Sequence, residues 1–236
     1  RIMKKGILAF IMFFVMTSAS FADSNVYITQ SGAGLDLDIT LDGNGNAVGA
    51  SNDRTLLTGA NLDVDIDLIG ATNTITGDFI GAGESGSDDL KISQTGSTNT
   101  TALNVGASAA TDDVKIIETR VGSSGATSYI IGSSATVQDV SVTVDVIGDD
   151  IDIALTENSS SSGSDKTTDI DIGTDSDDVD IVITHSGAGA HKTKLLCTGS
   201  CAGSDFTMSQ TGANSTDVDI TVTNATASDV DITITD

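Results

Sequence analysis

The feature that most constrains the fold is a two-residue alternation of apolar and polar side chains. In residues 62–68, 178–183, 217–222 and 229–234, Val, Ile or Leu alternates with Asp or Thr. Because successive side chains of a β-strand point to opposite faces, this period predicts strands with one buried and one exposed face. No comparable stretch shows helical spacing, so we expect an all-β protein.

The strands recur at a regular interval. Strand starts are expected at residues 24, 61, 88, 112, 138, 177, 204 and 228, and most are 24 to 27 residues apart. A unit of this size, two strands joined by a Gly, Ser or Asn turn, cannot bury its own apolar face. Stacked units therefore predict a β-solenoid of strand-turn-strand rungs. The two longer intervals predict loop insertions near 42–59 and 157–176, and the terminal strands are expected to have open edges.

The N-terminal segment has the pattern of an export signal. Lys4 and Lys5 precede an apolar run, residues 6–16, and small residues lead up to Ala22. We expect residues 1–22 to be a secretion signal peptide that is cleaved after Ala22, with translation starting at Met3. Residues 23–236 would then form the solenoid domain, exported through the periplasm to the cell surface or medium. No later apolar run is long enough to insert that domain into a membrane.

The charge of the expected domain limits its partners. The whole chain has a formal net charge of −24; without the three basic residues of the signal, seven basic face 34 acidic residues, which gives −27. Nucleic acid is excluded as a natural partner because phosphate recognition requires a basic surface, and the same charge opposes docking on anionic lipid. The expected domain has no tryptophan and only four other aromatic residues, Tyr27, Phe79, Tyr129 and Phe206, so a core built on large aromatic side chains is not expected.

Three turn regions share a motif. Residues 88–99 end in Gln-x-Gly-x-x-Asn, while residues 204–212 and 24–32 carry Ser-x5-Gln-x-Gly. This pattern resembles the curlin repeat of bacterial curli fibres, over about three of the units. Residues 183–187 repeat 28–32 with His185 in place of Gln30, so His185 is expected to be a turn or ladder residue.

The resemblance implies a role for the motif residues at the corners of the rungs. Gln30, Gln94, Asn99, Gln210 and Asn214 would form inward amide ladders. Gly32, Gly96 and Gly212 would form the accompanying turns. It also implies self-assembly into an extracellular amyloid fibre, with a nucleator and an outer-membrane export pore as further partners.

The Asp-x-Asp strands place carboxylates on the outer face in rows. The residues are Asp63, Asp65, Asp178, Asp180, Asp217, Asp219, Asp229 and Asp231. Two interpretations stay open: a solubilising face that delays assembly through repulsion, or a face on which Ca²⁺ binds weakly and favours stacking. No specific metal site and no cofactor is expected.

Cys197 and Cys201 are the only cysteines. In an exported chain their spacing favours a disulfide across a tight turn. A zinc site that also uses His185 and His191 is a less favoured alternative.

We expect no enzymatic activity, because neither histidine lies in a catalytic motif. The leading hypothesis is a self-assembling fibre subunit for biofilm matrix or surface adhesion. The alternative is a secreted β-solenoid binding module, an adhesin or a cation- or ice-binding protein, that stays monomeric. Its candidate residues are Thr221, Thr223, Thr233 and Thr235.

Overall fold

The computed structural model describes thirteen parts of the chain. They are residues 14–16, 24–49, 55–80, 88–106, 114–132, 139–158, 165–173, 176, 178–187, 189–198, 201–212, 215–223 and 229–235. All regular structure in these residues is β-strand, which confirms the all-β prediction.

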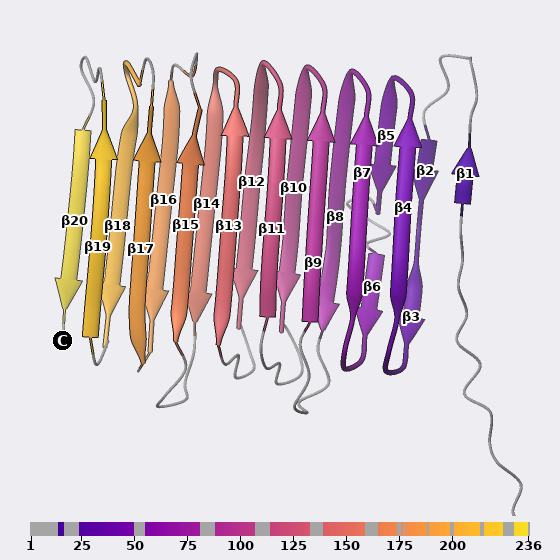
Figure 1. Ribbon diagram of the computed structural model, residues 1–236, viewed down its shortest axis with the longest axis horizontal. Coiled ribbons are helices and arrows are strands. Elements are labelled where there is room, and N and C mark those ends of the chain that lie inside the picture. Colours follow the sequence, from indigo (N-terminus) through magenta and orange to yellow (C-terminus); the bar gives the residue numbers. More distant parts are fainter. Residues whose placement is uncertain are drawn as a thin grey trace, which may run out of the picture.

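The strands form two parallel sheets that face each other along the whole molecule (Figure 1). Sheet A has the order β1 (Phe14–Met16), β4 (Asp36–Asp42), β7 (Asp63–Ile69), β9 (Asp88–Thr95), β11 (Val114–Val121), β13 (Val140–Ile147), β15 (Lys166–Ile172), β17 (Ala190–Cys197) and β19 (Ser215–Val222). Sheet B has the order β2 (Ser24–Val26), β5 (Gly45–Val48), β8 (Thr72–Ile80), β10 (Thr98–Val105), β12 (Ser124–Ile131), β14 (Ile151–Asn158), β16 (Val179–Ser186), β18 (Asp205–Thr211) and β20 (Asp229–Thr235), and β3 (Thr29–Ser31) and β6 (Thr55–Thr58) pair beside this path. The chain alternates between the sheets, which is the predicted β-solenoid.

Each rung repeats the register of the previous one. In sheet A, Asp36 pairs with Asp63 and Asp63 with Asp89, 27 and 26 residues further along, and Lys166 pairs with His191 after 25 residues. Because register is kept, every side chain lies above its counterpart in the next rung, and the molecule consists of continuous rows of side chains. We call a row inward when it lies between the sheets and outward when it faces solvent.

The inward rows form one hydrophobic core. Strand β13 alternates buried and outward residues, and its Val142 and Val144 are at most 1% exposed. Branched aliphatic side chains suit a pleated, parallel sheet that is covered on one side, as here. Tyr129 and Phe79 are among the few aromatic residues of this core.

The two predicted insertions need correction. The segment 42–59 contains β5 and β6, and the segment 157–176 contains β15, all paired within the sheets. The expected strand starts at 24, 177, 204 and 228 correspond to strands of sheet B, whereas the others correspond to sheet A. The strands of both sheets have the same two-residue alternation and cannot be told apart by it. Each of the two long intervals was therefore measured from a strand of one sheet to a strand of the other, which made it falsely long.

Most of the expected signal peptide, including Ala22, lies outside the described residues. Its part at Phe14–Met16 forms β1, which pairs in parallel with β4 at the end of sheet A.

Candidate functional site

A row of glycines forms the corner where sheet A leads into sheet B. A Cβ atom built on Gly96 would overlap the carbonyl oxygen of Gly70, and one built on Gly70 would overlap that of Gly43. The backbones of successive rungs therefore approach each other so closely that only glycine fits. This explains why the corner sequence needs Gly96 at its position.

Beside the glycines, three asparagines form a buried ladder. Asn46 Nδ2 donates to Asn73 Oδ1 at 3.1 Å, and Asn73 Nδ2 donates to Asn99 Oδ1 at 2.9 Å. The same Nδ2 groups reach turn carbonyls, as with Asn73 to Thr95 O at 3.1 Å. The ladder role expected for Asn99 is confirmed. Its partners Asn46 and Asn73 were missed, although Gly-x-x-Asn at 43–46, 70–73 and 96–99 marks them.

The glutamines do not stack on one another. Gln94 lies in sheet A between Leu68 and Arg120, whereas Gln210 lies in sheet B between His185 and Ile234. Gln30 lies beside Leu57 in the same inward row as Gln210 but far along the stack. The expected ladder of these glutamines is therefore wrong, because successive motif copies fall on different sheets.

Gln94 and Gln210 instead form hydrogen bonds across the corners in which they lie. Gln94 accepts from Thr101 Oγ1 at 3.2 Å, and Gln210 Nε2 donates to Thr216 Oγ1 at 3.1 Å. Each bond joins the two strands that flank a turn. His185 pairs in register with Gln210, which confirms the expectation that it takes a glutamine position in the repeat.

Two of the remaining motif glycines lie in turns with positive φ. The angle is 143° at Gly32 and 76° at Gly212, which favours glycine at both positions. Asn214 lies outside the described residues, so its expected role stays a prediction.

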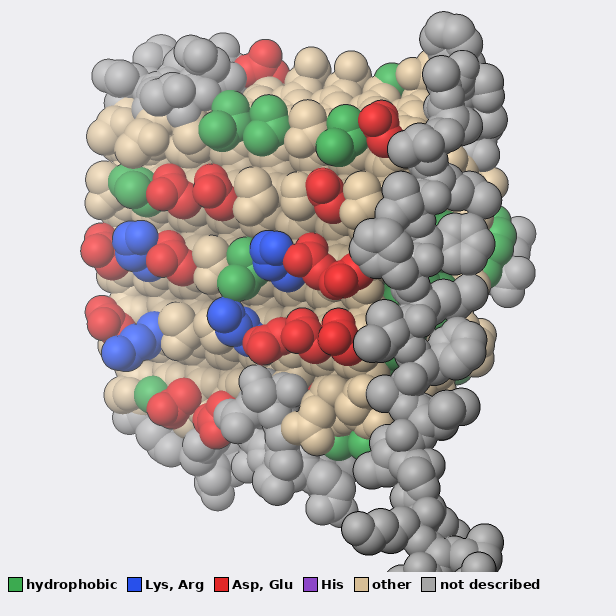
Figure 2. All heavy atoms as spheres, turned by 45° about the vertical axis from the view of Figure 1, so that its right-hand side comes forward, with side chains coloured by type: hydrophobic (Ala, Val, Ile, Leu, Met, Phe, Trp, Pro, Cys, Tyr) green, Lys and Arg blue, Asp and Glu red, His purple; other side chains and the backbone are tan. Residues whose placement is uncertain are grey.

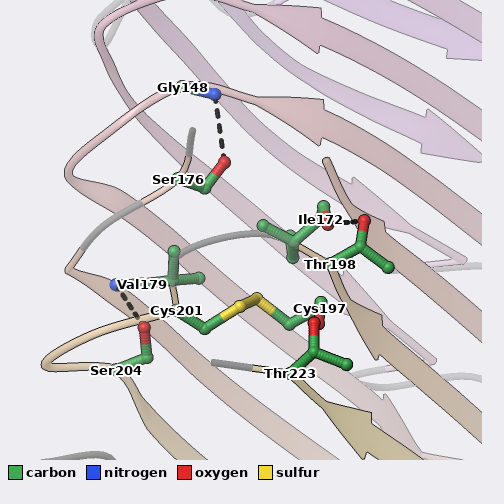
Figure 3. Close-up of a disulfide and its surroundings, with 9 residues drawn as sticks. All are labelled: Gly148, Ile172, Ser176, Val179, Cys197, Thr198, Cys201, Ser204 and Thr223. Atoms are coloured by element: carbon green, nitrogen blue, oxygen red, sulfur yellow. Dashed lines mark hydrogen bonds between the residues drawn. A yellow bond between two sulfur atoms is a disulfide. The ribbon is translucent and has the colours of Figure 1, made fainter. Parts of the chain in front are cut away.

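The expected disulfide joins Cys197 and Cys201 after β17 (Figure 3). Both cysteines are fully buried. Hydroxyl groups support the neighbouring turns, since Ser176 Oγ accepts from Gly148 N at 3.3 Å and Ser204 Oγ accepts from Val179 N at 3.2 Å. Because both thiols are consumed in the disulfide, a zinc site on them is ruled out.

The eight carboxylates expected on one face are divided between two. Asp63, Asp65, Asp217 and Asp219 lie on sheet A, whereas Asp180, Asp229 and Asp231 lie on sheet B. Asp178 lies in a turn with a φ of 56°, a conformation that Asp tolerates better than most residues. The single acidic face is therefore wrong for the same reason as the glutamine ladder.

On sheet A, lysines interrupt the acidic rows (Figure 2). Lys91 Nζ lies 2.7 Å from Asp65, and Lys194 Nζ lies 3.0 Å from Asp169. The pKa of Asp63 is raised by partial desolvation and then by the neighbouring Asp36 and Asp89. Opposite charges in adjacent strands relieve part of this repulsion.

On sheet B, one outward row carries Asp152, Asp180, Asp205 and Asp229 in consecutive rungs. The pKa of Asp180 is raised by desolvation and then by Asp205 and Asp152. Among the described residues, no group of three or more His, Cys, Asp or Glu is arranged to hold a metal ion. Weak Ca²⁺ binding stays a prediction.

The interior holds two polar clusters that the sequence analysis missed. In the first, the buried Glu118 carboxylate accepts from the hydroxyls of Thr101 at 2.8 Å, Thr127 at 3.0 Å and Tyr129 at 3.0 Å. Arg120 Nη1 also donates to Thr127 Oγ1 at 2.9 Å. Burial lowers the pKa of Arg120, while Glu118 opposes that shift.

The second cluster surrounds Glu157, which is fully buried. Its Oε2 lies 3.2 Å from His185 Nε2, and its Oε1 accepts from Thr168 Oγ1 at 3.3 Å. Lys166 Nζ lies 3.2 Å from His191 Nε2, and the two imidazole rings are 5.5 Å apart. The cluster therefore links β14, β15, β16 and β17 inside the core.

Burial keeps three groups of this second cluster neutral near pH 7. Desolvation raises the pKa of Glu157 to about 8 and lowers that of His185 to about 3 and that of His191 to about 4. A protonated Glu157 can donate from Oε2 to the neutral His185 ring. The two-residue alternation of their strands would have marked Glu157 and His191 as inward residues, although a polar side chain alone favours an outward position.

The threonines proposed for a binding face do not share one. Thr221 is in β19 of sheet A, whereas Thr233 and Thr235 are in β20 of sheet B. Thr223 follows β19, and its hydroxyl donates to Cys197 O at 3.0 Å. These four residues do not form a flat recognition surface.

Comparison with known protein families, with curated protein sequences and with solved structures gave no match for this chain. Within the described ranges, no helix is long and apolar enough to span a membrane.

Proposed function

We propose that residues 23–236 form a secreted structural subunit that assembles with copies of itself into a curli-like extracellular amyloid fibre. The observation that carries the proposal is the in-register parallel stacking of the rungs. Since each rung offers the next the same backbone edge and matching inward rows, the arrangement that builds one molecule can also join two. The fibre would serve in biofilm matrix or surface adhesion.

The last described rung supports this proposal. Val230, Ile232 and Ile234 occupy inward rows of β20 but are 43% to 47% exposed, unlike their counterparts in earlier rungs. Within the described part of the chain, β20 pairs only with β18, and β19 only with β17. A second copy stacked on this rung would cover the three side chains and pair both strands.

The test is assembly of purified residues 23–236, followed by amyloid-dye fluorescence, electron microscopy and fibre diffraction. Fibres with a reflection near about 4.8 Å along their axis are expected. A protein that stays monomeric in sedimentation over days would contradict the proposal and favour the discrete binding module.

A matched pair of variants locates the contact. Ile232→Lys places a charge in an inward row of the exposed rung, so we expect assembly to stop while the monomer stays folded. Thr233→Lys adds the same charge to an outward row of the same strand and should assemble. Equal assembly of both variants would exclude stacking through β20.

A further inference from the structure

The rows of the solenoid define how two copies would meet, if the proposed stacking occurs. We extend the register of sheet A by one step, so that β19 of one copy pairs with β4 of the next. The inward rows then place Val218 on Leu37 and Ile220 on Ile39, because each pair belongs to one row within the chain. The apolar rows continue across this junction.

Sheet B gives a similarly compatible junction. Its rows place Val230 on Val26, Thr233 on Thr29 and Asp229 on Asn25. No like charges meet in these three pairs. The matching rows on both sheets identify the occupant of the exposed rung as a second copy of this chain in the same orientation.

The outward rows of sheet A are different. They bring Asp217 against Asp36 and Asp219 against Asp38, and all four side chains are exposed in the single molecule. Beyond β4 both rows continue with carboxylates of β7. In β9 the row of Asp38 has Lys91, whereas the row of Asp36 has a further carboxylate, Asp89. Beyond β19 they continue with the two lysines of β17. The junction thus concentrates carboxylates in directly opposed pairs, with the nearest cations at least one rung away.

We infer that these two Asp pairs form an electrostatic barrier to end-to-end stacking, and that acid and salt lower this barrier. At the strand spacing of about 4.8 Å, one like-charge pair in the dielectric of bulk water disfavours the contact by a factor of about 4. Two pairs disfavour it by a factor of roughly 20. Protonation of the carboxylates removes this barrier and salt screens it.

The edge of β4 that takes part is paired with β1 in the full chain. β1 belongs to the segment expected to be removed on export, so the junction is tested in residues 23–236. The pKa of Asp63 is raised by desolvation and then by Asp36 and Asp89, the direction expected when carboxylates in one row oppose one another's ionisation.

The experiment measures the elongation of preformed seeds at pH 3, where ordinary aspartates are largely protonated, and at pH 7.5, both at low salt. The wild-type domain should elongate roughly 20-fold more slowly at pH 7.5. A variant with Asp36→Asn and Asp38→Asn should reduce that ratio to a few-fold. The control with Asp152→Asn and Asp180→Asn loses the same charge from sheet B, away from the junction pairs, and should keep the wild-type ratio.

A charge-reversal variant gives a second, independent readout. With Asp36→Lys and Asp38→Lys, the new side chains face Asp217 and Asp219, as Lys91 faces Asp65 within the chain. Elongation should then be faster at pH 7.5 than at pH 3, where the carboxylates are largely protonated.

Two outcomes would overturn this inference: a wild-type ratio in the Asp36→Asn and Asp38→Asn variant, or an equal loss of the ratio in the control. Absence of elongation at any pH in every protein would instead refute the proposed fibre function.

Discussion

Glu157→Gln should stabilise the protein by an amount that grows with pH. Between pH 4.5, where a carboxyl of ordinary pKa ionises in the unfolded chain, and pH 8, the folded chain holds a proton that the unfolded chain releases. Rising pH therefore favours unfolding of the wild type throughout this range. Glutamine has no proton to release, and Gln210 shows that an amide fits the same inward row.

The size of the effect follows from the shift. The difference between 4.5 and about 8, at about 1.36 kcal/mol per unit, approaches about 5 kcal/mol above pH 8. At pH 7 the expected gain is about 3 kcal/mol, and at pH 5 it is within about 1 kcal/mol. The two histidines of the cluster titrate in both proteins, so they largely cancel in the comparison.

The assay is urea unfolding followed by circular dichroism at pH 5, 6, 7 and 8, at concentrations where sedimentation shows monomer. Asp152→Asn is the control, because it removes a carboxylate from the outward face of the same strand; it should stay within about 0.5 kcal/mol of wild type. A constant difference between Glu157→Gln and wild type from pH 5 to pH 8 would refute the account of a neutral, buried carboxyl.

Three further perturbations, two substitutions and one chemical reduction, test the corners. Gly96→Ala should cost about 3 kcal/mol of unfolding free energy, because the new Cβ would overlap the carbonyl oxygen of Gly70. The control Ser97→Ala changes an exposed residue of the same turn and should cost under about 0.5 kcal/mol. Equal costs would contradict the close approach of the two backbones. Asn73→Ala should cost about 4 kcal/mol in urea unfolding, because two or more buried polar groups lose their partner. Reduction of the Cys197–Cys201 disulfide should cost about 2 kcal/mol, judged from its short loop, and an unchanged melting curve in reductant would oppose this.

The fold could be predicted from the sequence because its main determinant is local. Alternation along residues 62–68 or 217–222 defines which side chains are buried, and the repeat length requires stacking. The assignment of strands to sheets could not be predicted this way, since both strands of a rung have the same period. This ambiguity misplaced Gln94 relative to Gln210 and divided the expected acidic face.

The interior clusters depend on tertiary register and not on local pattern. Glu157 lies near the end of β14 and Lys166 begins β15, and residue type alone favours solvent for both. Only the pairing of Glu157 with His185, and of Lys166 with His191, brings them together in the core. By contrast, Asn46 and Asn73 could have been found, because their Gly-x-x-Asn turns recur at the repeat interval.

The asparagine ladder also bears on how such a chain can change in length. Loss of residues 70–95, one whole rung, would bring Gly43 next to Gly96 and Asn46 next to Asn99, so the corner would close with the same contacts. Loss of the rung that carries Glu157 would instead leave His185 without the carboxyl group that it faces. Gene duplication or deletion can therefore add or remove rungs in the part of the protein that carries Asn46, Asn73 and Asn99. The rungs that carry Glu157 and His185 must instead stay next to each other.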